Sequence, residues 1–172
     1  MSKKVIDYGA VEAARFGISR SPLWYEVQKK HLQLQPECVA CKPGSVSGKE
    51  GLQVHHMFPF HYCILLGRPD LELDQRNLIT LCEKEKSCTA QDHHLLIGHL
   101  DDFKSSNLKV EVDAEHTYYN MTEDQIKDNK AWQAEKVNKL TPFDKMTQKE
   151  KDDYVALMNK TFPKTNMTLP ED

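Results

Sequence analysis

The sequence predicts an α+β fold of two short strands and a short helix, with two adjacent pairs of histidines at the ends of these elements. A structural zinc knuckle lies beside them, and helices flank this core at both ends. Three observations predict this fold. A Cys-x2-Cys pair stands in a turn-rich segment, residues 52–54 and 78–81 have the composition of short strands, and two capping boxes follow residue 120.

The composition indicates a small protein with a lean core. The chain has 172 residues, of which 39% are hydrophobic, so a metal knuckle is expected to replace part of the missing apolar packing. No apolar run of about 18 residues and no secretory h-region occur in it. We therefore expect a cytoplasmic protein, in a bacterial or phage-infected cell, and its five cysteines are then better explained as thiolate ligands than as disulfides.

The first expected helix begins near Ser21-Pro22, where a hydroxyl stands at the N-cap and a proline at the first helical position. Leu23, Val27 and Leu34 share one face of it, and Pro36 ends it.

The two strands follow at residues 52–54 and 78–81, joined by a connection that holds two prolines and a glycine. A short helix is expected from Asp92 to Ile97, before Gly98. The order is therefore strand, loop, strand and helix.

Two helical stretches are expected after residue 120. Thr122 with Gln125 and Thr147 with Glu150 fit capping boxes, and the helices should reach about Leu140 and Lys160. Their expected packing faces are as follows: Ile126, Val137 and Leu140, then Tyr154, Leu157 and Met158.

The cysteines predict the zinc site. Cys38 and Cys41 form the Cys-x2-Cys pair in a Gly/Pro turn, and Cys82 follows the second strand. The fourth ligand is either Cys88 or His93, because zinc accepts both ligand sets in tetrahedral geometry.

Cys63 stands in the apolar stretch 62–66, and we expect it to be buried without a metal.

Six of the eight histidines fall between residues 55 and 99, and four of these form two adjacent pairs. Adjacent histidines suit a division of labour in which one binds a metal while its neighbour takes a proton. The members of the cluster are His55, His56, His61, His93, His94 and His99.

Three segments carry a resemblance to a known family. They read L-Q-V-H-H-M-F-P-F-H at 52–61, L-D-Q-R-N-L-I-T-L-C at 73–82, and H-L-L-I-G-H-L at 94–100. In this order, behind a Cys-x2-Cys pair and R-S-P-L-W at 20–24, they resemble the HNH endonucleases, in particular small bacterial and phage members. The resemblance covers about residues 19–115 and implies a ββα-metal (His-Me finger) HNH core, with residues 1–18 as an N-terminal extension and 120–172 as a helical C-terminal appendage.

The resemblance also implies roles. His56 would be the general base, His55 and His94 would bind a catalytic divalent metal, and Asn77 would hold the loop that aims His56. His99 would be a third ligand or a contact to the scissile phosphate.

The spacing of His94 and His99 is unusual for two ligands on one helix. Five residues correspond to about 140° around an ideal α-helix, so we expect Gly98 to end the helix and let His99 turn back.

The implied activity is metal-dependent hydrolysis of DNA phosphodiester bonds, with Mg²⁺, Mn²⁺, Ni²⁺ or Zn²⁺ as the catalytic metal and Zn²⁺ in the knuckle. Lys104, Ser105 and Asn107 are candidate contacts to backbone phosphate. The C-terminal helices would serve a protein partner, such as a phage packaging component. A net charge of −3 favours no class of partner by itself.

The alternative is a non-catalytic zinc module that binds nucleic acid or protein, which needs only the cysteines. Within the nuclease interpretation, restriction, toxin, homing and packaging roles all stay open.

Overall fold

The computed structural model describes residues 7–41, 51–83 and 91–165. Its central unit is a two-stranded antiparallel sheet of β1 (Leu52–His56) and β2 (Leu78–Cys82), which share one register from the Leu52↔Cys82 pair to the His56↔Leu78 pair. The α+β class expected from the sequence is confirmed in this coarse form.

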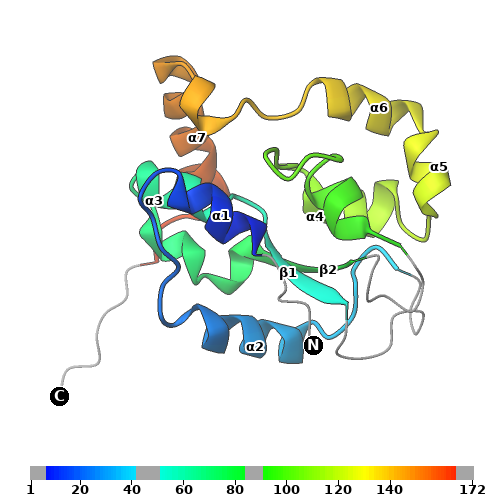
Figure 1. Ribbon diagram of the computed structural model, residues 1–172, viewed down its shortest axis with the longest axis horizontal. Helices are drawn as coiled ribbons and strands as arrows, with labels where there is room; N and C mark the ends of the chain where they lie inside the picture. Colours follow the sequence, from blue (N-terminus) through cyan, green and yellow to red (C-terminus); the bar gives the residue numbers. More distant parts are fainter. Residues whose placement is uncertain (1–6, 42–50, 84–90, 166–172) are drawn as a thin grey trace.

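Helices pack on both faces of the sheet. Helix α2 (Trp24–Leu34) lies along one face, and η3 (His94–Gly98), a short π-helix, contacts both strands on the other (Figure 1). Successive side chains of a strand point to opposite faces, so His55 and His56 of β1 face different layers.

The connection between the strands is helical. It contains three short elements: α3 (Phe60–Leu65), η1 (Pro69–Glu72) and η2 (Gln75–Asn77). The remaining elements are these: α1 (Tyr8–Ala14), α4 (Val110–Val112), η4 (Asp113–Thr117), α5 (Glu123–Lys127), α6 (Lys130–Val137), η5 (Phe143–Lys145) and α7 (Gln148–Thr161).

Helix α2 begins two residues later than its sequence suggests. Leu23 occupies the N-cap position without a side-chain cap, because the Ser21 hydroxyl accepts a hydrogen bond from the Leu23 N–H within a turn that precedes the helix. The expected end near Pro36 is close to the observed last residue, Leu34.

Both predicted capping boxes are present, at the starts of α5 and α7. The first predicted helix is nevertheless two helices, because the Asn129 side chain accepts from the Ala131 N–H and starts α6 anew. Val137, expected on the packing face, is 82% exposed, and Trp132 is the buried residue of α6.

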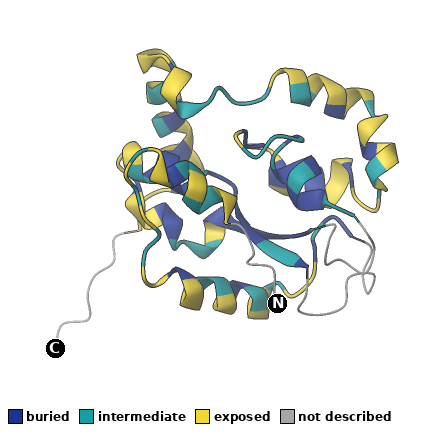
Figure 2. Ribbon diagram, in the orientation of Figure 1, coloured by how far each residue is buried: buried dark blue, intermediate teal, exposed yellow. Residues whose placement is uncertain are grey.

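One hydrophobic core joins most of these elements. It runs from Cys82 at the end of β2 to the C-terminal helices, where Trp132 and Met158 are buried with it; Figure 2 shows the buried residues in dark blue. Trp132 also donates its indole N–H to the Leu96 carbonyl at 2.7 Å. Residues 120–165 therefore pack against the sheet-bearing part of the chain, although a domain boundary near residue 120 stays a prediction.

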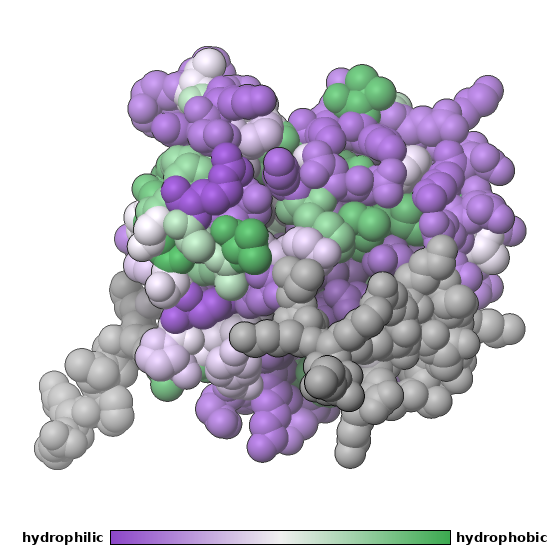
Figure 3. Space-filling view, in the orientation of Figure 1, coloured by the Kyte–Doolittle hydropathy of each residue, from purple (hydrophilic) through white to green (hydrophobic). Residues whose placement is uncertain are grey.

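Hydrophilic side chains cover most of the outer surface of the C-terminal helices, and most apolar ones gather toward the middle of the same face (Figure 3). Within the described ranges, no helix has the length and apolar character needed to span a bilayer.

Candidate metal centres and the adjoining pocket

Three cysteines and one histidine converge at the end of β2. The Cys38, Cys41 and Cys82 sulfurs lie 3.6, 3.4 and 3.3 Å from His93 Nδ1, and the Cys41 and Cys82 sulfurs are 3.8 Å apart. Tetrahedral zinc at its usual bond lengths would separate two sulfurs by about 3.8 Å and a sulfur from a nitrogen by about 3.6 Å. The four side chains are buried, and their geometry fits a structural metal such as zinc.

His93 is held in the tautomer that a metal needs. Its Nε2 lies 3.1 Å from the Met121 carbonyl, which can only accept, so Nε2 carries the proton and Nδ1 presents its lone pair to the sulfurs. Hydrogen bonds from Cys41 and Cys82 lower the pKa of Cys38, which favours the thiolate that binds a metal.

Of the two alternatives for the fourth ligand, the structure brings His93 to the cluster, and Cys88 lies outside the described residues. Cys63 is fully buried and donates to the Phe58 carbonyl, apart from the cluster, as expected.

A second cluster joins His55, His94 and His99. The Nε2 atoms of His94 and His99 are 3.2 Å apart, and the His55 ring lies 5.2 and 4.7 Å from the other two rings, centroid to centroid. Two imidazole nitrogens on one metal are separated by about 2.9–3.4 Å. His55 Nε2 is buried without a hydrogen-bond partner among the described residues, so the donor set fits a divalent cation.

The π-helix explains how residues five apart become neighbours. Hydrogen bonds in a π-helix join residues i and i+5, so η3 brings His99 back over His94. The helix ends at Gly98 and the two side chains approach each other, as expected, but the helix is a π-helix and not an α-helix. The Ser105 carbonyl accepts from His99 Nδ1 at 2.6 Å, which leaves Nε2 with its lone pair on the side of His94.

Gly98 allows the close approach of η3 to β1. A Cβ at this position would lie 3.1 Å from His55 Cε1 and 3.3 Å from a Leu81 methyl, closer than carbon atoms usually pack. A larger residue here would push the His55 ring away from the other two.

His56 faces the opposite side of β1. Its Nε2 donates to the Glu72 carbonyl at 2.8 Å, so Nδ1 carries the lone pair, and its ring stacks on Trp24 at 4.6 Å. Burial is the main cause, and the positive charge of Arg20 the second, of a pKa of His56 that is lowered to about 3. The imidazole is therefore neutral with its lone pair at Nδ1, and the lowered pKa makes it a weaker proton acceptor than a solvent-exposed histidine.

Asn77 ties the connection between the strands together. Its Oδ1 accepts from the Phe58 N–H at 2.7 Å, and its Nδ2 donates to the carbonyls of Phe58 and Leu71, each at 3.0 Å. The side chain is fully buried. The backbone contacts across the loop are those expected of Asn77, and its role in aiming His56 stays a prediction.

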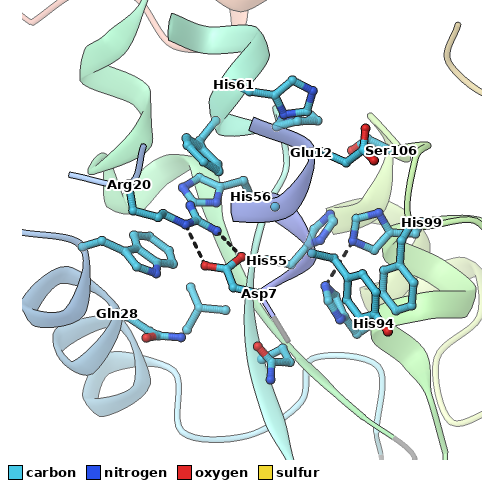
Figure 4. A pocket seen from close by; sticks show the side chains of 18 of the residues that line it. Asp7, Glu12, Arg20, Gln28, His55, His56, His61, His94, His99 and Ser106 are labelled. Carbon is cyan, nitrogen blue, oxygen red and sulfur yellow. Dashed lines mark hydrogen bonds and ion pairs between the residues drawn. The ribbon is translucent and has the colours of Figure 1, made fainter. Parts of the chain in front are cut away.

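Both faces of β1 open into one pocket of about 600 Å³ (Figure 4). His56 lies beside Arg20 and Asp7 on one side, and the trio His55, His94 and His99 lies on the other. His61 of α3 also lines this pocket, and it stacks on Phe16 without joining either cluster.

The candidate phosphate contacts have different positions. Lys104 is exposed and Ser105 is buried at the pocket wall. Asn107 is buried, and its amide donates to the Ile97 carbonyl and to Asp113, so the expectation that it contacts phosphate is not compatible with this arrangement. Its side chain instead holds the segment after η3.

Sequence reasoning assigned no role to Arg20 or Asp7. Arg20 Nε and Nη2 each donate to an Asp7 carboxylate oxygen at 2.9 Å, inside the pocket. The only signal for Arg20 was its place in the R-S-P-L-W segment, and Asp7 had none, because their pairing depends on how α1 packs against α3.

No protein-family model, no curated protein and no solved structure matches the chain.

Proposed function

We propose that this protein is an HNH-type endonuclease that hydrolyses phosphodiester bonds in DNA. One observation carries the proposal. Neighbouring histidines of β1 line one pocket in two ways: His55 joins the trio with His94 and His99, while the Glu72 carbonyl fixes the His56 tautomer that carries its lone pair at Nδ1.

His55, His94 and His99 would hold the catalytic divalent cation. When bound, such a cation supplies positive charge that stabilises negative charge growing on the phosphate and on the leaving 3′-oxygen. The protein's share in this is to keep three imidazoles converged, with the carbonyl of Ser105 fixing the tautomer of His99.

His56 accepts a proton at Nδ1 from the water that attacks phosphorus. The bond from phosphorus to the 3′-oxygen breaks as the new bond forms, and that oxygen is protonated from solvent, which leaves a 5′-phosphate and a 3′-hydroxyl. Glu72 holds the ring of His56 through its carbonyl, and Asn77 holds the loop to which Glu72 belongs. Lys104, exposed at the pocket wall, would contact a neighbouring phosphate.

The Cys38–Cys41–Cys82–His93 cluster has a structural task in this proposal. It fastens the segment before β1 to the end of β2 and to the residue that precedes η3, and so it fixes the elements that carry the histidine trio.

A non-catalytic zinc module is the competing explanation. Such a module needs only the cysteine cluster. It does not explain why three histidines converge, or why the Glu72 carbonyl holds the His56 ring.

The proposal is tested by incubating the purified protein with supercoiled plasmid and Mg²⁺, Mn²⁺, Ni²⁺ or Zn²⁺ in turn, with EDTA as the control. Conversion to nicked or linear DNA with at least one cation, and none with EDTA, is expected. Intact plasmid under every condition would favour the zinc module.

A further inference from the structure

Arg20 is held rigidly in the pocket. Its guanidinium lies 4.5 Å from the centroid of the Trp24 ring and 3.9 Å from that of Phe60. Aromatic rings on a guanidinium fix its plane and leave its edge free for a planar or tetrahedral oxyanion. Its Nη1 is buried and has no hydrogen-bond partner among the described residues, so Asp7 does not use all of its donors.

The same contacts fix Arg20 relative to His56. Trp24 stacks on both residues. Glu72 accepts from His56 through its carbonyl and from the Ser21 N–H through its carboxylate, each within 2.9 Å. The backbone of Ser21, the residue after Arg20, and the His56 ring are thus both held by Glu72.

Asp7 is more accessible than its partner. Its side chain is 42% exposed against 16% for Arg20. Burial opposes its ionisation, but the hydrogen bonds and charge of Arg20 outweigh this and lower its pKa, so it is a carboxylate. A carboxylate on the Nε–Nη2 edge has the fork geometry that a phosphate adopts on arginine.

Asp7 belongs to a helix that crosses the pocket. As the N-cap of α1 it also accepts from the Ala10 N–H, and the next residue, Tyr8, stacks on Phe103 at 3.9 Å and 5°. Phe103 in turn contacts the rings of His94 and His99.

Helix α1 also packs closely on Arg20. A Cβ at Gly9 would lie 2.8 Å from Arg20 Nη2. The start of α1 therefore spans the pocket from the Arg20 side to the histidine trio.

We propose that Arg20 is a phosphate-binding residue of this pocket, and that Asp7 occupies its binding edge until a phosphate of the substrate displaces it. This inference rests on the proposed function, because it names the residue that would hold the nucleic-acid backbone beside His56. The start of α1, which carries Asp7, then covers the binding edge of Arg20 and must shift when the substrate binds.

The test compares Asp7→Asn, Arg20→Lys, Arg20→Gln and the double variant Asp7→Asn/Arg20→Gln with wild type. Asparagine is as good an N-cap as aspartate, so Asp7→Asn removes the charge and keeps the cap. Asp144→Asn is the matched control, because Asp144 pairs with Arg15 outside the pocket and its side chain is also 42% exposed. Binding of a short DNA duplex is measured by fluorescence anisotropy without added divalent metal, over a range of salt concentrations.

Asp7→Asn should tighten DNA binding at least about threefold more than Asp144→Asn, because only Asp7 competes for the phosphate site. Arg20→Gln should weaken binding and reduce the slope of log K against log salt by about one, the change for one lost phosphate contact. Arg20→Lys should weaken it less, and the double variant should lose the gain from Asp7→Asn.

Equal affinities for Asp7→Asn and Asp144→Asn, with an unchanged salt slope for Arg20→Gln, would overturn the inference even if the wild type cuts plasmid. A wild type that cuts no plasmid while these binding changes appear would overturn the nuclease and leave the phosphate site standing.

Discussion

Backbone carbonyls fix the tautomer of three histidines of the candidate sites. The carbonyls of Met121, Glu72 and Ser105 accept from His93, His56 and His99, and each leaves the other ring nitrogen with its lone pair. A carbonyl can only accept, so in the neutral ring the tautomer does not depend on a mobile side chain. Two of these nitrogens face candidate metal positions, and the third, that of His56, faces a different layer.

Gly98→Ala tests whether the short distance from His55 to His94 and His99 matters for metal binding. The added methyl would lie 3.1 Å from His55 Cε1, so we expect the ring to move by a few tenths of an ångström and affinity for a divalent cation at this centre to fall by about tenfold. Calorimetric titration with Mn²⁺ measures it.

The zinc content of the same sample is the internal control, since the methyl does not meet the cysteine cluster. Wild-type Mn²⁺ affinity in the alanine variant would show that Gly98 has no part in placing His55.

The cysteine cluster was predictable from the sequence, whereas the groups that hold His56 and Arg20 in the pocket were not. The Cys-x2-Cys spacing is local, and Cys82 follows a recognisable strand, so the pattern reports the site. The anchor on His56 is a backbone carbonyl, which any residue at position 72 would supply, so no residue type marks it.

At the scale of elements, the π-helix decides whether His94 and His99 meet. An α-helix would place residues five apart on different faces, and sequence reasoning assumed that geometry. Tertiary packing of η3 against both strands selects the wider turn instead. Both capping boxes were predicted correctly, because each involves residues only three apart, whereas the N-cap expected at Ser21 is not the start of α2.

Changing the length of η3 tests this interpretation. Deleting Leu95, which is half-buried, gives the four-residue spacing that an α-helix brings to one face, whereas inserting an alanine after Leu95 gives a spacing of six. We expect the deletion to retain Mn²⁺ binding at the trio and the insertion to reduce it by at least about tenfold. Circular dichroism verifies the fold of each variant. Equal Mn²⁺ affinities in the two variants would show that the turn of η3 does not decide whether His94 and His99 bind one metal.

For the whole molecule, the cysteine cluster joins segments that are far apart in sequence. Its members come from residues 38–41, from β2 and from the residue before η3, and its three sulfur atoms belong to the same core as Trp132 and Met158. A metal there closes long loops and adds its binding free energy to folding. Loss of the metal should therefore affect the entire fold.

Cys38→Ser measures that dependence. We expect the wild type to carry about one zinc per chain, and the variant to lose it and melt at a temperature lower by at least about 10 °C. Cys63→Ala is the matched control, since Cys63 is equally buried but lies outside the cluster. A wild type without zinc, or a Cys38→Ser variant with the melting temperature of the wild type, would contradict a structural zinc.

The division of labour between His56 and His94 is the central claim, and plasmid cleavage across a metal titration tests it most directly. His56→Ala should keep its fold, zinc and affinity for the catalytic metal, yet cut at least about 100-fold more slowly, the usual scale for a lost general base. His94→Ala should also lose cleavage, but through weaker metal binding, so that excess metal restores part of the rate. His116→Ala, at an exposed histidine outside the pocket, should cut like the wild type. Wild-type rates from a folded His56→Ala protein would contradict this account.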